Sequence, residues 1–321
     1  MRILITGVTG FVGSHLADLA VAAGADVYGA SRWRSATENV AHLRDRLHLV
    51  ECDVRDPSSV QRLLDIARPD WIAHLAGQSS VGASWTTPAE TFHTNVLSQV
   101  HVLEAVRARP GPPPRVLVVG SSEEYGLVRD GELPVTEDNA LRPVSPYAVS
   151  KVAQDLMGFQ YFRSYGLPIV RSRAFNHDGP RRPDVFVTGS FARQIVAIER
   201  GERPPVIEVG NLQARRDYTD VRDIVRGYWQ LLERGEPGEV YNLCSGAAWS
   251  IEDILQRLLS LSRVEGIAVK EDPARLRPAD IPLLVGSAAR MERATGWRPT
   301  IPFEQTLADV LDYWRSRVTA G

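Results

Sequence analysis

A tyrosine and a lysine four residues apart could form a proton-transfer centre. They are Tyr147 and Lys151, in the segment SPYAVSK at the expected start of a helix. Residues with this spacing lie on one face of a helix, one turn from each other. An ammonium group near a phenol lowers the pKa of the phenol, so the tyrosine could exchange a proton with a sugar hydroxyl or ketone near neutral pH. Taken singly, each is more often structural: an interfacial aromatic and a surface charge.

Ser121 lies in a second polar segment, GSSEEYG (120–126), which follows a predicted buried strand. Its hydroxyl could hydrogen-bond the same substrate oxygen as the tyrosine. The two glutamates behind it are costly at the end of a buried strand unless they have a function or contact water. If the strand continues, Ser121, Glu123 and Tyr125 share one face, so Glu123 faces a substrate and Glu124 faces away. Glu123 could then transfer a proton, or its carboxylate could only orient the serine or a sugar.

Glycines follow the first predicted strand in the segment TGVTGFVG (6–13), which opens a helix. Gly7 allows a tight turn, Gly10 lets the backbone approach a diphosphate, and Gly13 lets the helix pack close to the strand. A glycine triplet alone is a weak signal, but its strand–loop–helix context favours a dinucleotide site over a plain tight turn. The expected cofactor site also includes the residues between the glycines, Thr9, Phe11 and Val12.

The end of the second predicted strand indicates which dinucleotide binds. An NAD enzyme usually has an acidic residue there, which binds the ribose 2′-hydroxyl. Here Ser31 and Arg32 occupy that point, and they would bind a 2′-phosphate that a carboxylate would repel. The alternative is that Arg32 is only a solvated surface cation. We therefore expect NADP (NADPH), with NAD as a second option. Further cofactor contacts are expected after the third and fourth strands, at Asp53, Val54, Leu75, Ala76 and Gly77.

The elements that must hold these residues alternate between strand and helix. Strands are predicted at 2–6, 25–31, 47–54, 69–77 and 115–122, and helices at 13–24, 57–67, 88–108 and 146–165. Alternation at these lengths predicts right-handed βαβ units. The expected fold is therefore α/β, with a doubly wound parallel sheet of the Rossmann type and a smaller C-terminal lobe for the substrate.

The regular alternation of strands and helices ends after a sixth predicted strand. Strands near 169–174 and 239–243 are apolar enough to extend the main sheet. We expect residues 1–176 to form the cofactor-binding domain, with later segments around 205–245 contributing to it. Residues 177–321 are expected to form mainly the substrate-binding lobe, so the two domains would interleave.

The composition excludes several classes of protein. With 321 residues, 44% of them hydrophobic, the chain can bury the core of a large α/β protein. With a net charge of −2, the protein has no overall positive potential that would attract nucleic acid. The only cysteines, Cys52 and Cys244, lie in apolar segments, which indicates a reducing, cytoplasmic location. No apolar run is long enough to span a membrane, and no histidine or cysteine spacing suits a metal, so neither a membrane nor a metal site is expected.

The combination of TGVTGFVG, GSS…YG and YAVSK resembles the extended short-chain dehydrogenase/reductases that modify nucleotide sugars. The similarity runs through nearly the whole chain. RAFNHDGPRR, FVTGSFARQI, VGNLQARRDYTDVRD and LRPADIPLLVGS are similar to the branch that acts on GDP-mannose derivatives. The resemblance implies a GDP-sugar substrate and the catalytic residues Ser121, Tyr147 and Lys151, of which Tyr147 and Lys151 also contact the cofactor.

Two activities of this branch compete. A GDP-mannose 4,6-dehydratase would use Glu123 for the C5 proton and the C6 hydroxyl. A GDP-4-dehydro-6-deoxy-D-mannose reductase would instead form GDP-D-rhamnose, with a hydride from NADPH and a proton from Tyr147. The resemblance favours the reductase, because Phe11 and Val12 replace the Gln-Asp of the dehydratase loop and RDYTDVRD is closer to the reductase. A non-catalytic dinucleotide sensor is the remote alternative, and the intact catalytic set argues against it.

The resemblance also implies residues for the sugar nucleotide. Arginine suits a diphosphate because its planar fork can bind two oxygens at once. The expected substrate contacts are Ser79, Ser80, Ser121, Glu123, Asn176, Val187, Arg193, Arg216 and Arg277. His177 and Arg182 match cofactor-side positions of the dehydratase loop NHESPRR, although this loop reads NHDGPRR.

Two predicted helices, 88–108 and 146–165, carry more apolar surface than one face of a sheet needs. In related enzymes the matching pair forms a four-helix bundle across a two-fold axis. We therefore expect a homodimer.

Overall fold

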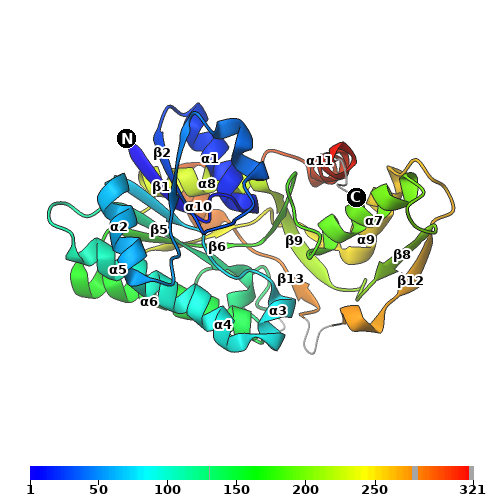
Figure 1. Cartoon of the computed structure of the whole chain (residues 1–321). Helices are drawn as coiled ribbons and strands as arrows, with labels where there is room; N and C mark the ends of the chain where they lie inside the picture. The colour runs from blue at the N-terminus through cyan, green and yellow to red at the C-terminus, as the bar shows by residue number, and fades with distance from the viewer. Residues whose placement is uncertain (130, 277–280, 318–321) are drawn as a thin grey trace.

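The computed structural model describes residues 1–129, 131–276 and 281–317 (Figure 1). Its main sheet has seven parallel strands in the order β10-β6-β5-β4-β1-β2-β3. These strands are β1 (Arg2–Thr6), β2 (Asp26–Ser31), β3 (Leu47–Glu51), β4 (Trp71–His74), β5 (Arg115–Ser121), β6 (Ile169–Ala174) and β10 (Val240–Leu243). The order reverses between β1 and β4, which is where open α/β sheets bind their ligands. The predicted Rossmann-type fold is confirmed.

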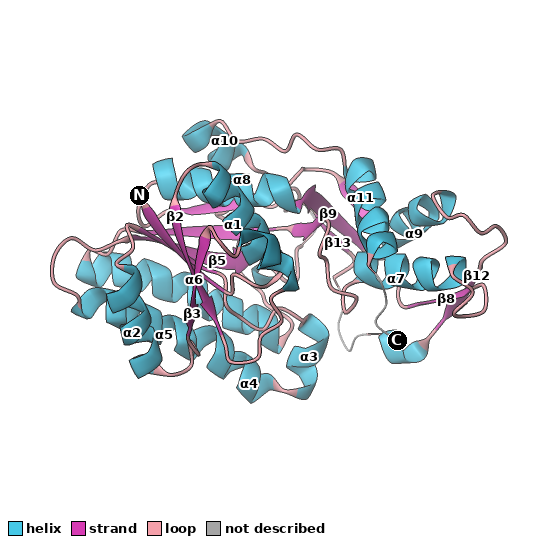
Figure 2. Ribbon diagram, turned by 45° about the horizontal axis from the view of Figure 1, so that its top comes forward, coloured by secondary structure: helices cyan, strands magenta, loops and turns pink. Residues whose placement is uncertain are grey.

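Helices cover both faces of this sheet (Figure 2). One face carries α1 (Phe11–Ala22), α8 (Val221–Arg234) and α10 (Ala289–Thr295), and the other carries α2 (Pro57–Ala67), α5 (Ser98–Ala108) and α6 (Pro146–Tyr165). Ile3 and Ile5 of β1 are buried in the core under α1 and α8, whereas Leu4 is buried in the core under α2 and α5. A strand buried on both sides explains the continuous apolar run RILIT. Within the described residues, no helix is both long enough and apolar enough to cross a membrane.

The helix expected at 88–108 is divided by a turn of π-helix. Its parts are α4 (Pro88–Phe92), the π turn η2 (His93–Leu97) and α5, and the short helix α3 (Val81–Thr86) precedes them. The buried side chain of Asn95 lies in the π turn and donates to the backbone carbonyl of Gln78 at 3.0 Å and to the hydroxyl of Ser150 at 2.9 Å. A local π-bulge of this kind is frequent at functional sites. Apolar periodicity cannot reveal it, because the flanking helical turns keep their pattern.

The C-terminal lobe has a separate hydrophobic core. Its elements are β7 (Asn176–Asp178), α7 (Val187–Glu199), β8 (Val206–Val209), β9 (Arg215–Asp220), β11 (Ala248–Ser250), α9 (Ile251–Ser260), β12 (Ala268–Glu271), β13 (Leu283–Leu284) and α11 (Phe303–Ser316). Three 3-10 turns complete the described chain, η1 (Glu38–Leu43), η3 (Ser122–Glu124) and η4 (Pro273–Arg275). In the lobe core, Tyr218 of β9 stacks on Phe303 of α11 with ring centroids 4.9 Å apart. Strand β9 therefore belongs to the core of the lobe and leads directly into α8.

The lobe and the main sheet exchange segments of chain. As expected, β6 and β10 extend the main sheet as a parallel pair. Strand β8 instead pairs with β12 inside the lobe, so the chain returns to the main sheet at α8, later than the expected residue 205. We propose two interleaved domains on this basis: residues 1–176 with 221–245 form the cofactor-binding domain, and the rest forms mainly the lobe.

Candidate active site

A cleft of about 1120 Å³ opens at the carboxyl ends of the main-sheet strands and is also lined by the lobe. All the described residues that were predicted for the site line this cleft except Arg193. Arg193 leaves α7 on its exposed face and lines an adjoining cavity of about 390 Å³, where it pairs with Asp184. Its expected contact with the nucleotide is therefore not supported by its position. Arg277 lies outside the described residues.

The turn between β1 and α1 has the shape that a dinucleotide diphosphate requires. Gly7 has a φ of +70°, and a Cβ there would lie 2.9 Å from the backbone nitrogen of Ala76. A Cβ on Gly13 would lie 2.2 Å from the carbonyl oxygen of Gly7, so only glycine lets the helix start this close to the strand. Gly10 is the N-cap residue of α1, and no side chain accepts a hydrogen bond from the first N–H groups of the helix. The first backbone N–H groups of α1 can therefore donate to an anion, and the turn fits a dinucleotide.

Ser31 and Arg32 lie at the end of β2 and line the same cleft. Asp53, after β3, is held by Arg55, whose guanidinium donates to both carboxylate oxygens at 2.7 to 3.1 Å. This pairing lowers the pKa of Asp53. Arg32, by contrast, is exposed and forms no ion pair with another described residue. A cation without a protein partner beside a serine hydroxyl fits a 2′-phosphate.

Ser121, Tyr147 and Lys151 meet in the cleft. Ser121 ends β5, while Ser145 caps α6 and thereby fixes the first helical turn, which contains Tyr147. The Tyr147 phenol lies close enough to the Ser121 side chain for that side chain to act on its pKa. Nζ of Lys151 donates to the carbonyl oxygen of Val119 at 2.9 Å and lies 5.9 Å from the centroid of the Tyr147 ring. The three residues can therefore act on one substrate oxygen.

Burial controls the ionisation of this site. Removal from water raises the pKa of Tyr147 well above its ordinary value, and the Ser121 side chain acts in the opposite direction. The predicted lowering of this pKa is not found, because burial outweighs it and the ammonium of Lys151 is directed to a backbone carbonyl. Burial also lowers the pKa of Lys151 to about 8. Near neutral pH, the tyrosine therefore holds a proton to donate and the lysine is charged.

The two glutamates after Ser121 lie in opposite environments. The strand does not continue, because β5 ends at Ser121 and the turn η3 follows, so the condition for a shared face of Ser121, Glu123 and Tyr125 is not met. The Ser121 hydroxyl accepts the N–H of Glu123 at 3.2 Å, and the Glu124 carboxylate accepts the N–H of Ser121 at 2.7 Å. Glu123 lines the cleft as expected. Tyr125 does not share its face, since it is fully buried and donates its hydroxyl to Asn242 at 2.6 Å.

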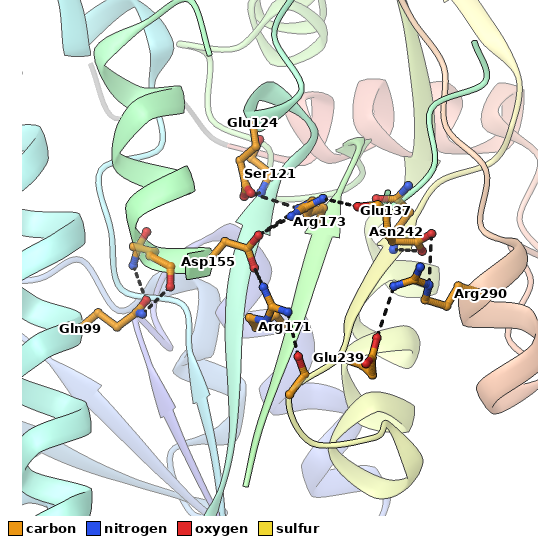
Figure 3. A network of polar contacts seen from close by, with 12 residues as sticks. Gln99, Ser121, Glu124, Glu137, Asp155, Arg171, Arg173, Glu239, Asn242 and Arg290 are labelled. Carbon is orange, nitrogen blue, oxygen red and sulfur yellow. Dashed lines mark hydrogen bonds and ion pairs between the residues drawn. The ribbon is translucent and has the colours of Figure 1, made fainter. Parts of the chain in front are cut away.

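Glu124 belongs to a buried network of two acids and two arginines behind Ser121 (Figure 3). Its Oε2 lies 3.2 Å from Nε of Arg173, on β6. Arg173 also donates to Asp155 of α6 at 3.1 and 2.5 Å, and Asp155 accepts from Arg171 at 2.8 Å. All four side chains are nearly inaccessible to water. Two carboxylates balance two guanidinium groups, so the buried charges are paired.

Polar residues of the lobe close the other side of the cleft. The Asn176 side chain hydrogen-bonds the hydroxyl of Tyr218, and Arg216 of β9 is buried. Arg216 donates to the carbonyl oxygens of Arg215, at 3.0 Å, and of Ile281. The site residues Ser79, Ser80 and Val187 also line the cleft.

His177 and Arg182 lie beside the glycine turn. The His177 ring stacks on Phe11, with centroids 6.0 Å apart, and burial lowers its pKa to about 4. Arg182 pairs with Asp178 at 3.0 Å, and its guanidinium lies 3.7 Å from the centroid of the Phe186 ring. The loop NHDGPRR thus contacts the predicted cofactor turn through a neutral imidazole.

Asn95 is a supporting residue that the sequence did not reveal. Besides its two donated hydrogen bonds, its side-chain oxygen accepts the N–H of Gln78 at 2.7 Å. It therefore ties the loop 75–79 to Ser150, the neighbour of Lys151. The only signal in the sequence is an amide inside an otherwise amphipathic helix, which is not specific.

Comparisons with known proteins agree with this site. The profile of a family described as GDP-mannose 4,6 dehydratase matches residues 4–310. The GDP-6-deoxy-D-mannose reductase of Pseudomonas aeruginosa is 37% identical over 317 residues, which cover 99% of this chain and 98% of that protein. A GDP-mannose 4,6-dehydratase of Vibrio cholerae is 29% identical over 347 residues, covering 97% and 92% of the two chains. The solved structure of RMD from Pseudomonas aeruginosa complexed with NADPH is similar with a TM-score of 0.84 and 33% identity, covering 99% of this chain and all of that one. The chain therefore belongs to the GDP-mannose 4,6-dehydratase family of short-chain dehydrogenase/reductases, as its motifs predict.

Proposed function

We propose that this protein reduces the C4 ketone of GDP-4-dehydro-6-deoxy-D-mannose and forms GDP-D-rhamnose. The observation that carries the proposal is that Ser121, Tyr147 and Lys151 meet in one cleft beside the dinucleotide turn. A protonated phenol and a serine hydroxyl together suit a ketone oxygen on which negative charge develops. The 37% identity to a GDP-6-deoxy-D-mannose reductase over 99% of the chain supports the same activity.

Each residue of the site has a separate role in this reaction. NADPH, when bound, supplies a hydride for the ketone carbon. Tyr147 donates its proton to the ketone oxygen, and Ser121 donates a hydrogen bond to the same atom. The ammonium of Lys151 favours the phenolate that remains after the proton has left. Tyr147 is buried and Ser121 and Lys151 are half-buried, so the access of water to the reacting oxygen is limited.

The cofactor and the nucleotide sugar occupy opposite parts of the cleft in this proposal. The glycine turn holds the cofactor diphosphate, and Ser31 with Arg32 favours the 2′-phosphate of NADPH over the hydroxyl of NADH. On the lobe side, the buried guanidinium of Arg216 and the amide of Asn176 bind the diphosphate of the GDP-sugar. The cofactor thus receives hydrogen bonds from the cofactor-binding domain, and the GDP-sugar receives them from the lobe.

A dehydratase is the second candidate, and Glu123 is the observation in its favour. Its side chain lines the cleft and lies close enough to Tyr147 to raise the pKa of that phenol. Within the described residues, its carboxylate forms no ion pair and accepts no hydrogen bond. A carboxylate in this position could take a proton from C5 of a bound sugar.

One experiment separates the two activities. The purified protein is incubated with GDP-mannose alone, and separately with the 4-dehydro-6-deoxy derivative and NADPH. We expect the absorbance of NADPH to fall only with the keto sugar. Conversion of GDP-mannose without net use of cofactor would show a dehydratase instead.

We also propose a cytoplasmic homodimer. Both cysteines are free and buried, which suits a reducing compartment. Large apolar side chains are exposed along η2 and α6, namely Leu97, Val149, Leu156, Phe159 and Tyr165. An apolar strip on the outer helices of the sheet fits a helix-to-helix interface across a two-fold axis. Light scattering at micromolar concentration checks the dimer, and a clean monomer would contradict it.

A further inference from the structure

Glu124 holds the backbone of the catalytic serine. Its Oε1 accepts the N–H of Ser121 at 2.7 Å, and its Oε2 pairs with Arg173 at 3.2 Å (Figure 3). The carboxylate lies directly against the end of β5, because a Cβ added to Gly120 would be only 2.2 Å from Oε1. Both oxygens of the carboxylate therefore have donors, one of them charged, in a place where water has no access.

The same contacts continue to the helix that carries the tyrosine and the lysine. Arg173 donates to Asp155 at 3.1 and 2.5 Å, and Asp155 lies on α6. Asp155 is four residues after Lys151, so the two side chains leave one face of the helix, a turn apart. An unbroken path of buried hydrogen bonds thus joins the end of β5 to α6. Through it, the position of Ser121 depends on the position of α6.

The charge of Glu124 also acts on Lys151. The ammonium donates to the carbonyl of Val119, and the Glu124 carboxylate lies on the next residue of the strand, Gly120. Burial, helped by Asp155, raises the pKa of Glu124 to about 8, although Arg173, the Ser121 N–H and Lys151 act in the opposite direction.

Three titratable groups from different elements surround the lysine. They are Glu124 from η3, Tyr147 from α6 itself and His74 from β4. Burial and Lys151 lower the pKa of His74 to about 3, and burial raises the pKa of Tyr147, so both are neutral near pH 7. Glu124, which titrates in the same range as Lys151, is therefore the one of the three whose ionised form can oppose the charge of the ammonium.

We propose that Glu124 is a positioning residue of the catalytic centre, which fixes Ser121 relative to α6 and supplies the negative charge that faces Lys151. Its effect on turnover rests on the reductase function proposed above. Its effect on Lys151 does not, and can be measured without substrate or cofactor.

The sequence offers a clean way to observe Lys151. Lys151 and Lys270 are the two lysines of the chain, so protein labelled with ¹³C-lysine gives two side-chain signals, and Lys270→Arg assigns them. Glu124→Gln keeps an oxygen that can accept the Ser121 N–H but removes the charge. From a wild-type value of about 8, we expect the pKa of Lys151 in this variant to fall to about 7 or below.

Glu137→Gln is the matched control. Glu137 is also a buried carboxylate, accepts the N–H of Asn242 at 2.8 Å and pairs with Arg290 at 3.6 Å, but its carboxylate contacts neither Ser121 nor α6 (Figure 3). We expect this variant to leave the titration of Lys151 unchanged. Equal Lys151 titrations in wild type and Glu124→Gln would overturn the proposal.

Kinetics test the positioning half of the proposal. With keto sugar and NADPH, the loss of activity at high pH should begin at lower pH in Glu124→Gln than in wild type or Glu137→Gln. If Glu124→Gln does not fold, Glu124→Asp replaces it: the charge remains, but the shorter side chain cannot reach the Ser121 N–H. We expect Glu124→Asp to keep the titration of Lys151 and to lose about ten- to a hundredfold in kcat. A wild-type kcat for Glu124→Asp would overturn the positioning role. A wild-type protein that fails to reduce the keto sugar would refute the proposed function, while the lysine titration would still decide the role of Glu124.

Discussion

The two sides of the cleft hold their charges in different ways. On the side of Ser121, Glu124 and Arg173 are buried and paired, and the Tyr147 side chain is also buried. On the lobe side, Arg216 is buried, but Arg275 lies 3.4 Å from Glu208 near the surface, and Arg193 of the adjoining cavity is 63% exposed. Enclosed charges interact strongly and lose little by reorganisation, whereas exposed pairs contribute little. The charges on the side of Ser121 are therefore held in place by their partners, whereas the exposed pairs of the lobe contribute little.

This difference predicts which substitutions lower kcat and which raise KM. Changes on the catalytic side should lower kcat, because they remove groups that act on the developing charge. Changes among exposed lobe arginines should act weakly and mainly on KM.

Tyr147→Phe should have the largest effect. It removes the proposed proton donor but keeps the buried ring. Loss of a general acid typically costs about 10²–10⁴-fold in rate. We expect a fall of that size in kcat for the keto sugar, measured by the absorbance of NADPH, with KM little changed. A kcat within tenfold of wild type would assign the proton to another group.

Glu123→Gln should cost less. In a reductase the tyrosine supplies the single proton, so Glu123 contributes only orientation or a hydrogen bond to the sugar. A contribution of about 1–3 kcal/mol corresponds to roughly ten- to a hundredfold in rate. The same assay, run beside Tyr147→Phe, gives the ranking. A greater loss in Glu123→Gln than in Tyr147→Phe would place the chemistry on the carboxylate.

Ser31→Asp should change the preference for the cofactor. A carboxylate at the end of β2 repels a 2′-phosphate and accepts a hydrogen bond from a 2′-hydroxyl. A charge-assisted hydrogen bond is worth about 1.5–3 kcal/mol, so the ratio of kcat/KM for NADPH to that for NADH should fall about tenfold or more. An unchanged ratio would show that this strand end does not contact the 2′ position.

The pH dependence should follow the ionisation of Lys151. A lysine is charged below its pKa, and burial lowers that of Lys151 to about 8. As the pH rises through this value, the ammonium that favours the phenolate is lost, so kcat/KM should decrease above about pH 8, by roughly tenfold per pH unit. A constant kcat/KM up to pH 10 would show that the charge of Lys151 is not required.

Arg193→Ala should have the smallest effect. Its exposed pair with Asp184 is of a kind worth about 0–1 kcal/mol, and the side chain does not line the main cleft. We expect KM to change less than about threefold. Arg216→Ala, at a buried position in the cleft, is the comparison and should raise KM by more. Equal effects of the two substitutions would remove the contrast between buried and exposed positions.

Local signals explain which elements the sequence predicted well. The bounds of β1, α2 and α6 agree with the predicted 2–6, 57–67 and 146–165. Both helices begin with a side-chain cap followed by proline, at Asp56 and Ser145, and such starts are readable from a few residues. The glycine turn and the pair Tyr147 and Lys151 are equally local.

Contacts between distant residues account for what the sequence missed. The ion pair of Glu124 and Arg173 joins residues 49 positions apart, and the Asn95 bond to Ser150 joins residues 55 apart. Alternation along β5 placed Glu124 away from the cleft, but it could not show that a 3-10 turn buries its side chain. The sequence also could not show that Arg193 lines the adjoining cavity, since helix periodicity does not say which exposed face of α7 borders the cleft.

The most direct test of the central claim follows the hydrogen itself. The keto sugar is reduced with NADPH carrying deuterium at the transferable position, and the product is examined by NMR. Reduction at this site predicts one deuterium at C4 of the product, no exchange at C5 when the reaction is run in D₂O, and loss of the signal with Tyr147→Phe. Exchange at C5, or turnover of GDP-mannose without oxidation of NADPH, would contradict the account and make Glu123 the acid–base group.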